Sequence, residues 1–169
     1  GLVLSTNGGK DWKMVSLQGT VDFHLLESSG SELYGADSQS GDLLYSSDLG
    51  KRWASRGKNT FSDIALNPAG KGDALALSQG KLFGTKDSFK TSSAIPLKIQ
   101  LTQIEWNSKR LVASSGANLL ISSDMGRTWK KQYSFKNPIG ILAHSNELLV
   151  AVVGSQVWKS SNDGRSFAL

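Results

Sequence analysis

The chain has 169 residues, of which 38% are hydrophobic and 20% are charged, with a net charge of +5 and no cysteine. This is the composition of an ordinary globular domain; the missing cysteines exclude disulfides and thiolate chemistry, and no apolar run approaches the roughly 18 residues of a membrane-spanning helix. The positive charge forms no basic block interleaved with aromatic residues, which argues against nucleic-acid binding.

Short strands joined by tight turns are expected throughout, because 18 glycines accompany only 3 prolines. Residues 1–16 provide two strands, and a pattern of four strands then recurs. The first strand of each unit is an apolar segment, at 21–26, 61–66, 101–106 and 139–143. The second and third flank a turn that contains glycine, at 33–36 and 43–45, 74–77 and 81–83, 111–113 and 119–121, and 148–152 and 156–158. The fourth begins at an aromatic residue. We label the strands a to d from the axis outward.

A short motif, called the box below, lies at the turn between strands c and d. Its four strong copies are STNGGKDW at 5–12, SSDLGKRW at 46–53, SSDMGRTW at 122–129 and SSNDGRSF at 160–167. A degenerate copy, Thr85-Lys86-Asp87-Ser88-Phe89, lacks the glycine, and we expect its turn to be shorter. The copies start at 5, 46, 85, 122 and 160, so the spacings are 41, 39, 37 and 38 residues. Four strands per period of about 40 residues indicate the blades of a β-propeller.

The residue types of the box indicate that its residues have structural roles. Its Asp or Asn can accept hydrogen bonds from backbone N–H groups, and its Gly can adopt a positive φ. The aromatic residue can then pack between blades. We therefore expect structural roles for Asn7, Gly9, Trp12, Asp48, Gly50, Trp53, Asp87, Asp124, Gly126, Trp129, Asn162, Gly164 and Phe167.

The S-x-D-x-G-x-T-W pattern resembles the Asp-box, or bacterial neuraminidase repeat, of sialidases, sortilin-type receptors and photosystem II assembly factors. The run 22–24 followed by 34–37, 40–41 and the next box is similar to secreted or lipoprotein Asp-box proteins of bacteria that are often labelled glycosylhydrolase-like. The resemblance implies an extracytoplasmic protein and further N-terminal blades, so that this chain would be part of a larger, six-bladed propeller.

One propeller domain over residues 1–169 is therefore expected, with about four and a half blades. The partial blade is 1–16, and the full blades are 17–56, 57–97, 98–133 and 134–169. A ring that lacks blades would expose open β edges, which can pair with another chain. A homodimer through these edges, or closure into a smaller ring, is therefore an expectation.

The candidate ligand site lies on the four a strands, because propeller ligands bind over the central channel. Side chains alternate along a strand, so Asp22, Asp63 and Gln103 should share one layer, and His24 and Glu105 the next. Asp22, His24, Asp63 and Glu105 could hold a divalent metal ion or a polar ligand. The alternative is that these residues line a water-filled channel without a function, in which case no cofactor is required.

Two functions remain open. The first is a non-catalytic extracytoplasmic scaffold that binds a protein or a glycan. The second is a glycosidase-like hydrolase, which would need two carboxylates about 5 to 9.5 Å apart over the channel. Sialidase activity is not expected, because the resembled enzymes need an arginine triad and an Arg-Ile-Pro segment. Only Arg56 and Arg110 lie outside the box turns, and Arg-Ile-Pro is absent.

Basic residues concentrate in or beside the boxes. They are Lys10, Lys13, Lys51, Arg52, Lys86, Lys90, Arg127, Lys130, Lys131, Lys159 and Arg165, which is 11 of the 19 Lys and Arg residues. An electropositive face of this kind predicts docking to an acidic protein or an anionic polymer of the cell envelope. Alternatively, lysine on outer edge strands only prevents aggregation.

Overall fold

The computed structural model describes residues 1–145 and 147–169, which form seventeen β-strands and no helix. The chain divides into two compact units, Gly1–Phe61 and Ser62–Leu169, and each is considered by itself. In the described residues no helix is long and apolar enough to cross a membrane.

Unit 1 contains one two-stranded and one four-stranded antiparallel sheet. The strands are β1 (Leu2–Leu4), β2 (Lys13–Ser16), β3 (Phe23–Ser29), β4 (Glu32–Asp37), β5 (Asp42–Ser46) and β6 (Ala54–Lys58). β1 pairs with β2, and β3 to β6 pair in chain order. The strands labelled c and d in residues 1–16 and a to d after them are therefore present, although β6 ends two residues beyond the expected blade end at 56.

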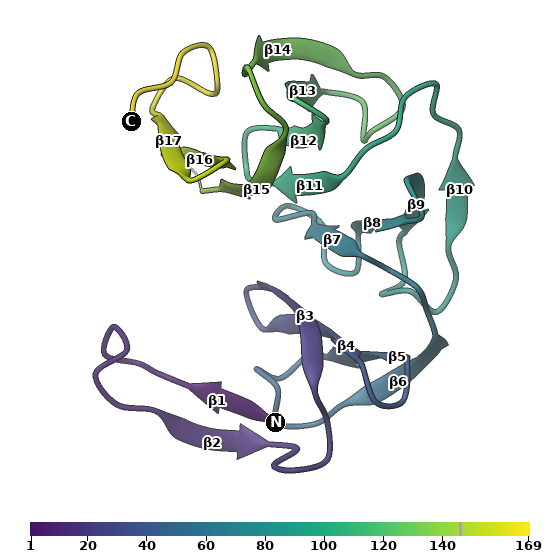
Figure 1. Ribbon diagram of the computed structural model, residues 1–169. Helices are drawn as coiled ribbons and strands as arrows, with labels where there is room; N and C mark the ends of the chain where they lie inside the picture. The colour runs from purple at the N-terminus through teal and green to yellow at the C-terminus, as the bar shows by residue number, and fades with distance from the viewer. Residues whose placement is uncertain (146) are drawn as a thin grey trace. The chain divides into compact units, whose positions relative to one another are not determined.

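Unit 2 contains three antiparallel sheets, each built in chain order (Figure 1). The strands are β7 (Asp63–Leu66), β8 (Ala74–Ser78), β9 (Lys81–Thr85), β10 (Ser93–Ile95), β11 (Gln103–Trp106), β12 (Leu111–Ser115), β13 (Asn118–Ser122), β14 (Lys130–Ser134), β15 (Ile139–His144), β16 (Leu149–Val153) and β17 (Gln156–Ser160). The third sheet has three strands where four were expected. Its last segment makes only an isolated bridge between Lys159 and Ala168.

The a strands of unit 2 lie side by side, because β11 contacts β7 on one side and β15 on the other (Figure 1). The core fills the space between the sheets. One cluster includes Leu75, Leu82, Ile104 and Leu111, and a second includes residues of the last two sheets such as Leu119. Each such aliphatic side chain stabilises the fold by about 1.5–3 kcal/mol when it is fully buried.

The box turns have the hydrogen bonds that the sequence predicts. In the box that follows β13, Oδ1 of Asp124 accepts hydrogen bonds from Oγ of Ser122 and from the backbone N–H of Thr128, both at 2.8 Å. Nε1 of Trp129 donates to the carbonyl of Gly126 at 2.9 Å. Gly126 has φ +81°, and a Cβ there would lie 2.7 Å from Leu82, so two independent constraints require glycine.

The degenerate box is not shorter than the others, so that expectation is wrong. Oγ1 of Thr85 accepts from the N–H of Phe89 at 3.0 Å, and Oδ1 of Asp87 accepts from the N–H of Thr91 at 2.9 Å. This is the spacing of the strong copies. Phe89 stands where they have glycine, at φ +58° and 6% exposed, and Ser92 stands where they have the aromatic residue. Burial of the ring compensates for the unfavourable backbone conformation.

Candidate functional site

Two of the four predicted channel residues, Asp22 and His24, belong to unit 1. Asp22 directly precedes β3, and His24 is the second residue of that strand. Their side chains are 55% and 73% exposed, and Nε2 of His24 lies 3.2 Å from Oδ2 of Asp22. Oγ of Ser38 donates to the same oxygen at 2.9 Å. They therefore form an exposed pair at the beginning of the a strand.

Asp63, in unit 2, joins two neighbouring a strands. Its Oδ2 accepts a hydrogen bond from the backbone N–H of Ile104 on β11 at 2.7 Å, and its Oδ1 accepts from the N–H of Ile64 at 3.0 Å. Burial raises the pKa of Asp63 to about 6, against the opposing effect of these two hydrogen bonds. Gln103 acts similarly one sheet further on, since its Nε2 donates to the carbonyl of Gly140 at 3.1 Å.

Glu105, the fourth predicted residue, lies two positions beyond Gln103 on β11, opposite Val112, and is partly buried. Among the residues that the structure describes, no group of three or more His, Asp or Glu side chains is arranged to hold a metal ion. Asp63 and Gln103 thus have a structural role, because the side chain of each forms a hydrogen bond with the backbone of the next a strand.

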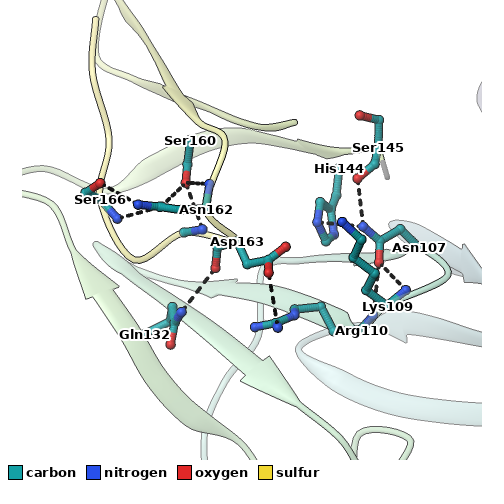
Figure 2. Close-up of polar contacts among 11 residues, drawn as sticks. Asn107, Lys109, Arg110, Gln132, His144, Ser145, Ser160, Asn162, Asp163 and Ser166 are labelled. Carbon is teal, nitrogen blue, oxygen red and sulfur yellow. Dashed lines mark hydrogen bonds and ion pairs between the residues drawn. The ribbon is translucent and has the colours of Figure 1, made fainter. Parts of the chain in front are cut away.

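A second group of polar residues gathers where the last two sheets of unit 2 meet, and we call Asn107, Arg110, His144 and Asp163 the His144 cluster (Figure 2). Asn107 and Arg110 flank the turn between β11 and β12, His144 ends β15, and Asp163 lies in the last box. Nη2 of Arg110 lies 3.3 Å from Oδ2 of Asp163, with both side chains about one quarter exposed. Turns a–b and c–d lie at the same end of a meander sheet, so this cluster is at the end that carries the boxes.

Asn107 fixes the protonation state of His144. Oδ1 of Asn107 accepts from the N–H groups of Lys109 and Arg110, at 2.8 and 2.9 Å. Its Nδ2 therefore faces Nε2 of His144, at 2.8 Å, and also donates to the carbonyl of Ser145 at 2.7 Å. Because Nδ2 is a donor, Nε2 must be an acceptor, which leaves the ring neutral with its proton on Nδ1.

The electrostatics of the cluster favour the same state. Burial lowers the pKa of His144, the positive charges of Arg110 and Lys109 lower it further, and the charge of Asp163 opposes them. Nδ1 of His144 and Nε of Arg110 are both buried without a hydrogen-bond partner among the described residues. His144 has its free lone pair occupied by Asn107, and Asp163 is paired with Arg110. The cluster is therefore suited to binding rather than to proton transfer.

A pocket of about 190 Å³ lies beside the cluster, between the a–b turns of two neighbouring sheets. Its lining includes Pro68, Trp106, Lys109, Arg110 and Met125. Lys109 is exposed and forms no ion pair within the described part of the chain. The pocket thus combines an indole ring, a thioether and two cations.

The sequence did not single out the His144 cluster as a site. His144 is the last residue of β15 and is half-buried. A usable signal was the recurrence of a polar residue at the start of the a–b turn. Asn67, Asn107 and Ser145 each accept backbone N–H groups of that turn through a side-chain oxygen. Arg56, the other arginine outside the boxes, lies in unit 1, 4.5 Å from the centroid of the Tyr45 ring.

Comparison with known proteins supports the fold. No protein-family model matches the chain, and no curated protein matches it in sequence. Among solved structures it is similar to PorZ, a surface component of the type-IX secretion system of Porphyromonas gingivalis, with 17% identity and a TM-score of 0.67 over 86% of this chain and 20% of that one. It is also similar to YCF48 bound to D1 peptide, with 15% identity and a TM-score of 0.60 over 81% of this chain and 50% of that one.

A third similar structure is the GH74 enzyme of Niastella koreensis, with 17% identity and a TM-score of 0.60 over 82% of this chain and 22% of that one. The chain spans half or less of the length of each of these three structures. The all-β, β-propeller fold class expected from the sequence is confirmed. The structures include a peptide-bound protein, a surface component of a secretion system and a GH74 enzyme, so likeness of fold alone does not choose between the two functions.

Proposed function

We propose that the chain is part of a non-catalytic, extracytoplasmic β-propeller that binds a protein partner through an acidic segment, at the end of unit 2 that carries the boxes. The observation that carries this proposal is the pocket beside the His144 cluster. Trp106 supplies an apolar surface, and Lys109 supplies a cation that no carboxylate of the described residues neutralises. Aromatic and cationic groups in one hollow are the usual anchors of a peptide with a carboxylate.

Two further observations support binding over hydrolysis. The cluster's histidine and carboxylate are already engaged, as described above, and both oxygens of Asp63 accept backbone hydrogen bonds. The similar structures include YCF48 with a bound D1 peptide and PorZ, a surface component of a secretion system. Extracytoplasmic placement is in keeping with PorZ and with the Asp-box resemblance.

The experiment is selection from a random peptide library displayed on phage, followed by measurement of affinity for the selected peptides by fluorescence anisotropy. We expect enrichment of Asp and Glu and an affinity that falls as salt rises. Lys109→Glu should weaken binding at least about fivefold, since an ion pair at a partly exposed site contributes about 1 kcal/mol.

Lys136→Glu is the matched control, because it makes the same charge change in the exposed segment that joins β14 to β15, at the other end of the sheet. It should leave affinity unchanged. Equal losses in both variants, or selected peptides without acidic enrichment, would contradict the proposal. Hydrolysis of a glycan by the chain, lost in Asp63→Asn, would favour the glycosidase alternative.

A further inference from the structure

A second hollow, of about 340 Å³, lies on the outer part of unit 2, and we call it the Gly84 hollow. Ala74, Leu75, Gly84 and Ile95 form its apolar floor. Lys86 and Arg127 stand at its edge, with Met125 beside them. It differs from the pocket beside the His144 cluster, which Trp106 and Lys109 line.

The hollow exists because one repeat lacks a side chain that the others have. The residue that directly precedes each box is Leu4, Tyr45, Gly84, Ile121 or Lys159, so that the β9 strand alone has glycine there. The registers are equivalent, since Tyr45 lies opposite Tyr34 and Gly84 lies opposite Leu75. The missing volume in unit 2 is therefore the volume that a phenol ring fills in the repeat of unit 1.

The unit 1 repeat shows how an aromatic ring is held at this position. The Tyr45 ring packs on the Tyr34 ring with centroids 5.0 Å apart, and Cζ of Arg56 lies 4.5 Å from the Tyr45 centroid. In the unit 2 repeat, Leu75 replaces Tyr34 as the apolar floor and Ile95, the third residue of β10, replaces Arg56. The position that the Tyr45 ring fills in unit 1 therefore has apolar neighbours in unit 2, but no side chain of residue 84 fills it.

Charge at the edge of the hollow restricts what can enter. Lys86 is paired with Asp73 at 3.2 Å. Arg127 is exposed and forms no ion pair within residues 1–145 and 147–169. A ligand that fills the apolar floor can therefore gain a charge-assisted hydrogen bond if it carries a carboxylate near its ring.

We propose that the Gly84 hollow binds an aromatic side chain of a partner peptide, with a carboxylate of the same peptide on Arg127. The ring lies over Leu75 and Ile95 as the Tyr45 ring lies in its own repeat. The face of the ring is open to the Arg127 guanidinium, which favours aromatic over aliphatic occupants.

The test is an NMR titration of the 169-residue chain with N-acetyl-tryptophan, N-acetyl-tryptophanamide and N-acetyl-leucine. We expect saturable shifts of the Gly84 amide and of the Ile95 and Met125 methyl groups, with a dissociation constant on the order of 1 mM for N-acetyl-tryptophan. The neutral amide should bind about threefold more weakly, and N-acetyl-leucine about tenfold. Arg127→Gln should abolish the difference between the acid and its amide.

Gly84→Tyr fills the hollow with the residue of the equivalent strand and should weaken N-acetyl-tryptophan binding at least tenfold. The change is sterically reasonable, because a Cβ at Gly84 would lie 3.2 Å from Cδ1 of Ile95, which is the end of a flexible side chain, and no positive φ requires glycine there. Ile95→Gln, which introduces the third residue of β14, provides a second variant with the same expected loss if Gly84→Tyr does not fold. No saturable shift at these residues, or unchanged affinity in the folded variant, would overturn the proposal.

Discussion

Asp63 gives the sharpest prediction, because its carboxyl is both buried and hydrogen-bonded to a neighbouring strand. Its pKa is raised from 3.8 to about 6 in the folded chain. The folded state therefore binds more protons than the unfolded state between these pH values. A stabilising contribution is present below about pH 4 and is lost as the pH rises through about 6. The shift of about two units corresponds to about 3 kcal/mol.

Asp63→Asn removes this titration while it keeps one oxygen to accept the N–H of Ile104. We expect the variant to be less stable than the parent chain at pH 4, because the second backbone hydrogen bond to Ile64 is lost. Between pH 4 and pH 8, however, the difference in unfolding free energy should shift by about 3 kcal/mol in favour of the variant. The measurement is urea unfolding followed by tryptophan fluorescence at both pH values.

A carbon NMR titration of the Asp63 carboxyl provides the direct check. A midpoint below pH 4.5, or stability curves of the variant and the parent chain that stay parallel from pH 4 to pH 8, would refute the reasoning. The difference between the two chains is the quantity to follow, because every other titrating group contributes equally to both.

Three further predictions follow from single groups. Phe89→Gly should lower the unfolding free energy by about 2–4 kcal/mol in urea unfolding, because loss of a buried ring exceeds the roughly 1 kcal/mol gained at its positive φ. Leu49→Gly is the control, since Leu49 has φ +61° but is 48% exposed, and it should be neutral or stabilising by up to about 1 kcal/mol. The pKa of His144 is lowered in the folded state, so the neutral ring stabilises the fold above pH 6.5, and this stabilisation is lost as the pH falls through the folded pKa. The melting temperature of His144→Gln should therefore depend less on pH between 7.5 and 5 than that of the parent chain. Hydrogen bonds from the side chain and backbone of Thr128 lower the pKa of Asp124 to about 2, so Asp124→Asn should flatten the loss of stability between pH 4 and pH 2, and an unchanged acid transition would contradict this.

The periodic part of the fold could be predicted from sequence because it depends on local chemistry. The box spacing located the turns, and the apolar segments located the strands. The degenerate box shows the limit of this reasoning. Absence of glycine predicted a shorter turn, but the turn depends on the oxygens of Thr85 and Asp87, which are both present. Phe89 tolerates the positive φ because its ring becomes buried, and burial is not visible in a local pattern.

The candidate site was harder to predict because its residues are brought together by the packing of neighbouring sheets. Asn107 and His144 are 37 positions apart, and Arg110 and Asp163 come from different kinds of turn. Alternation along strand a predicts that Asp22, Asp63 and Gln103 share a layer, and Asp63 and Gln103 are the first residues of β7 and β11. It could not reveal that both side chains bond to the backbone of the next a strand. Whether Asp22, His24, Asp63 and Glu105 act on a ligand remains a prediction.

The distribution of carboxylates explains why binding is the preferred function. A glycosidase of the usual kind needs one carboxyl of raised pKa and a second carboxylate about 5 to 9.5 Å away. The pKa of Asp63 is raised, but backbone N–H groups occupy both of its oxygens. The box aspartates have lowered values and are consumed by their turns, as Asp124 is. The two pockets offer cations to a partner, Lys109 at one and Arg127 at the other, and Met125 lines both. Cations beside apolar hollows select anionic, partly apolar ligands, which is the chemistry of a docking surface.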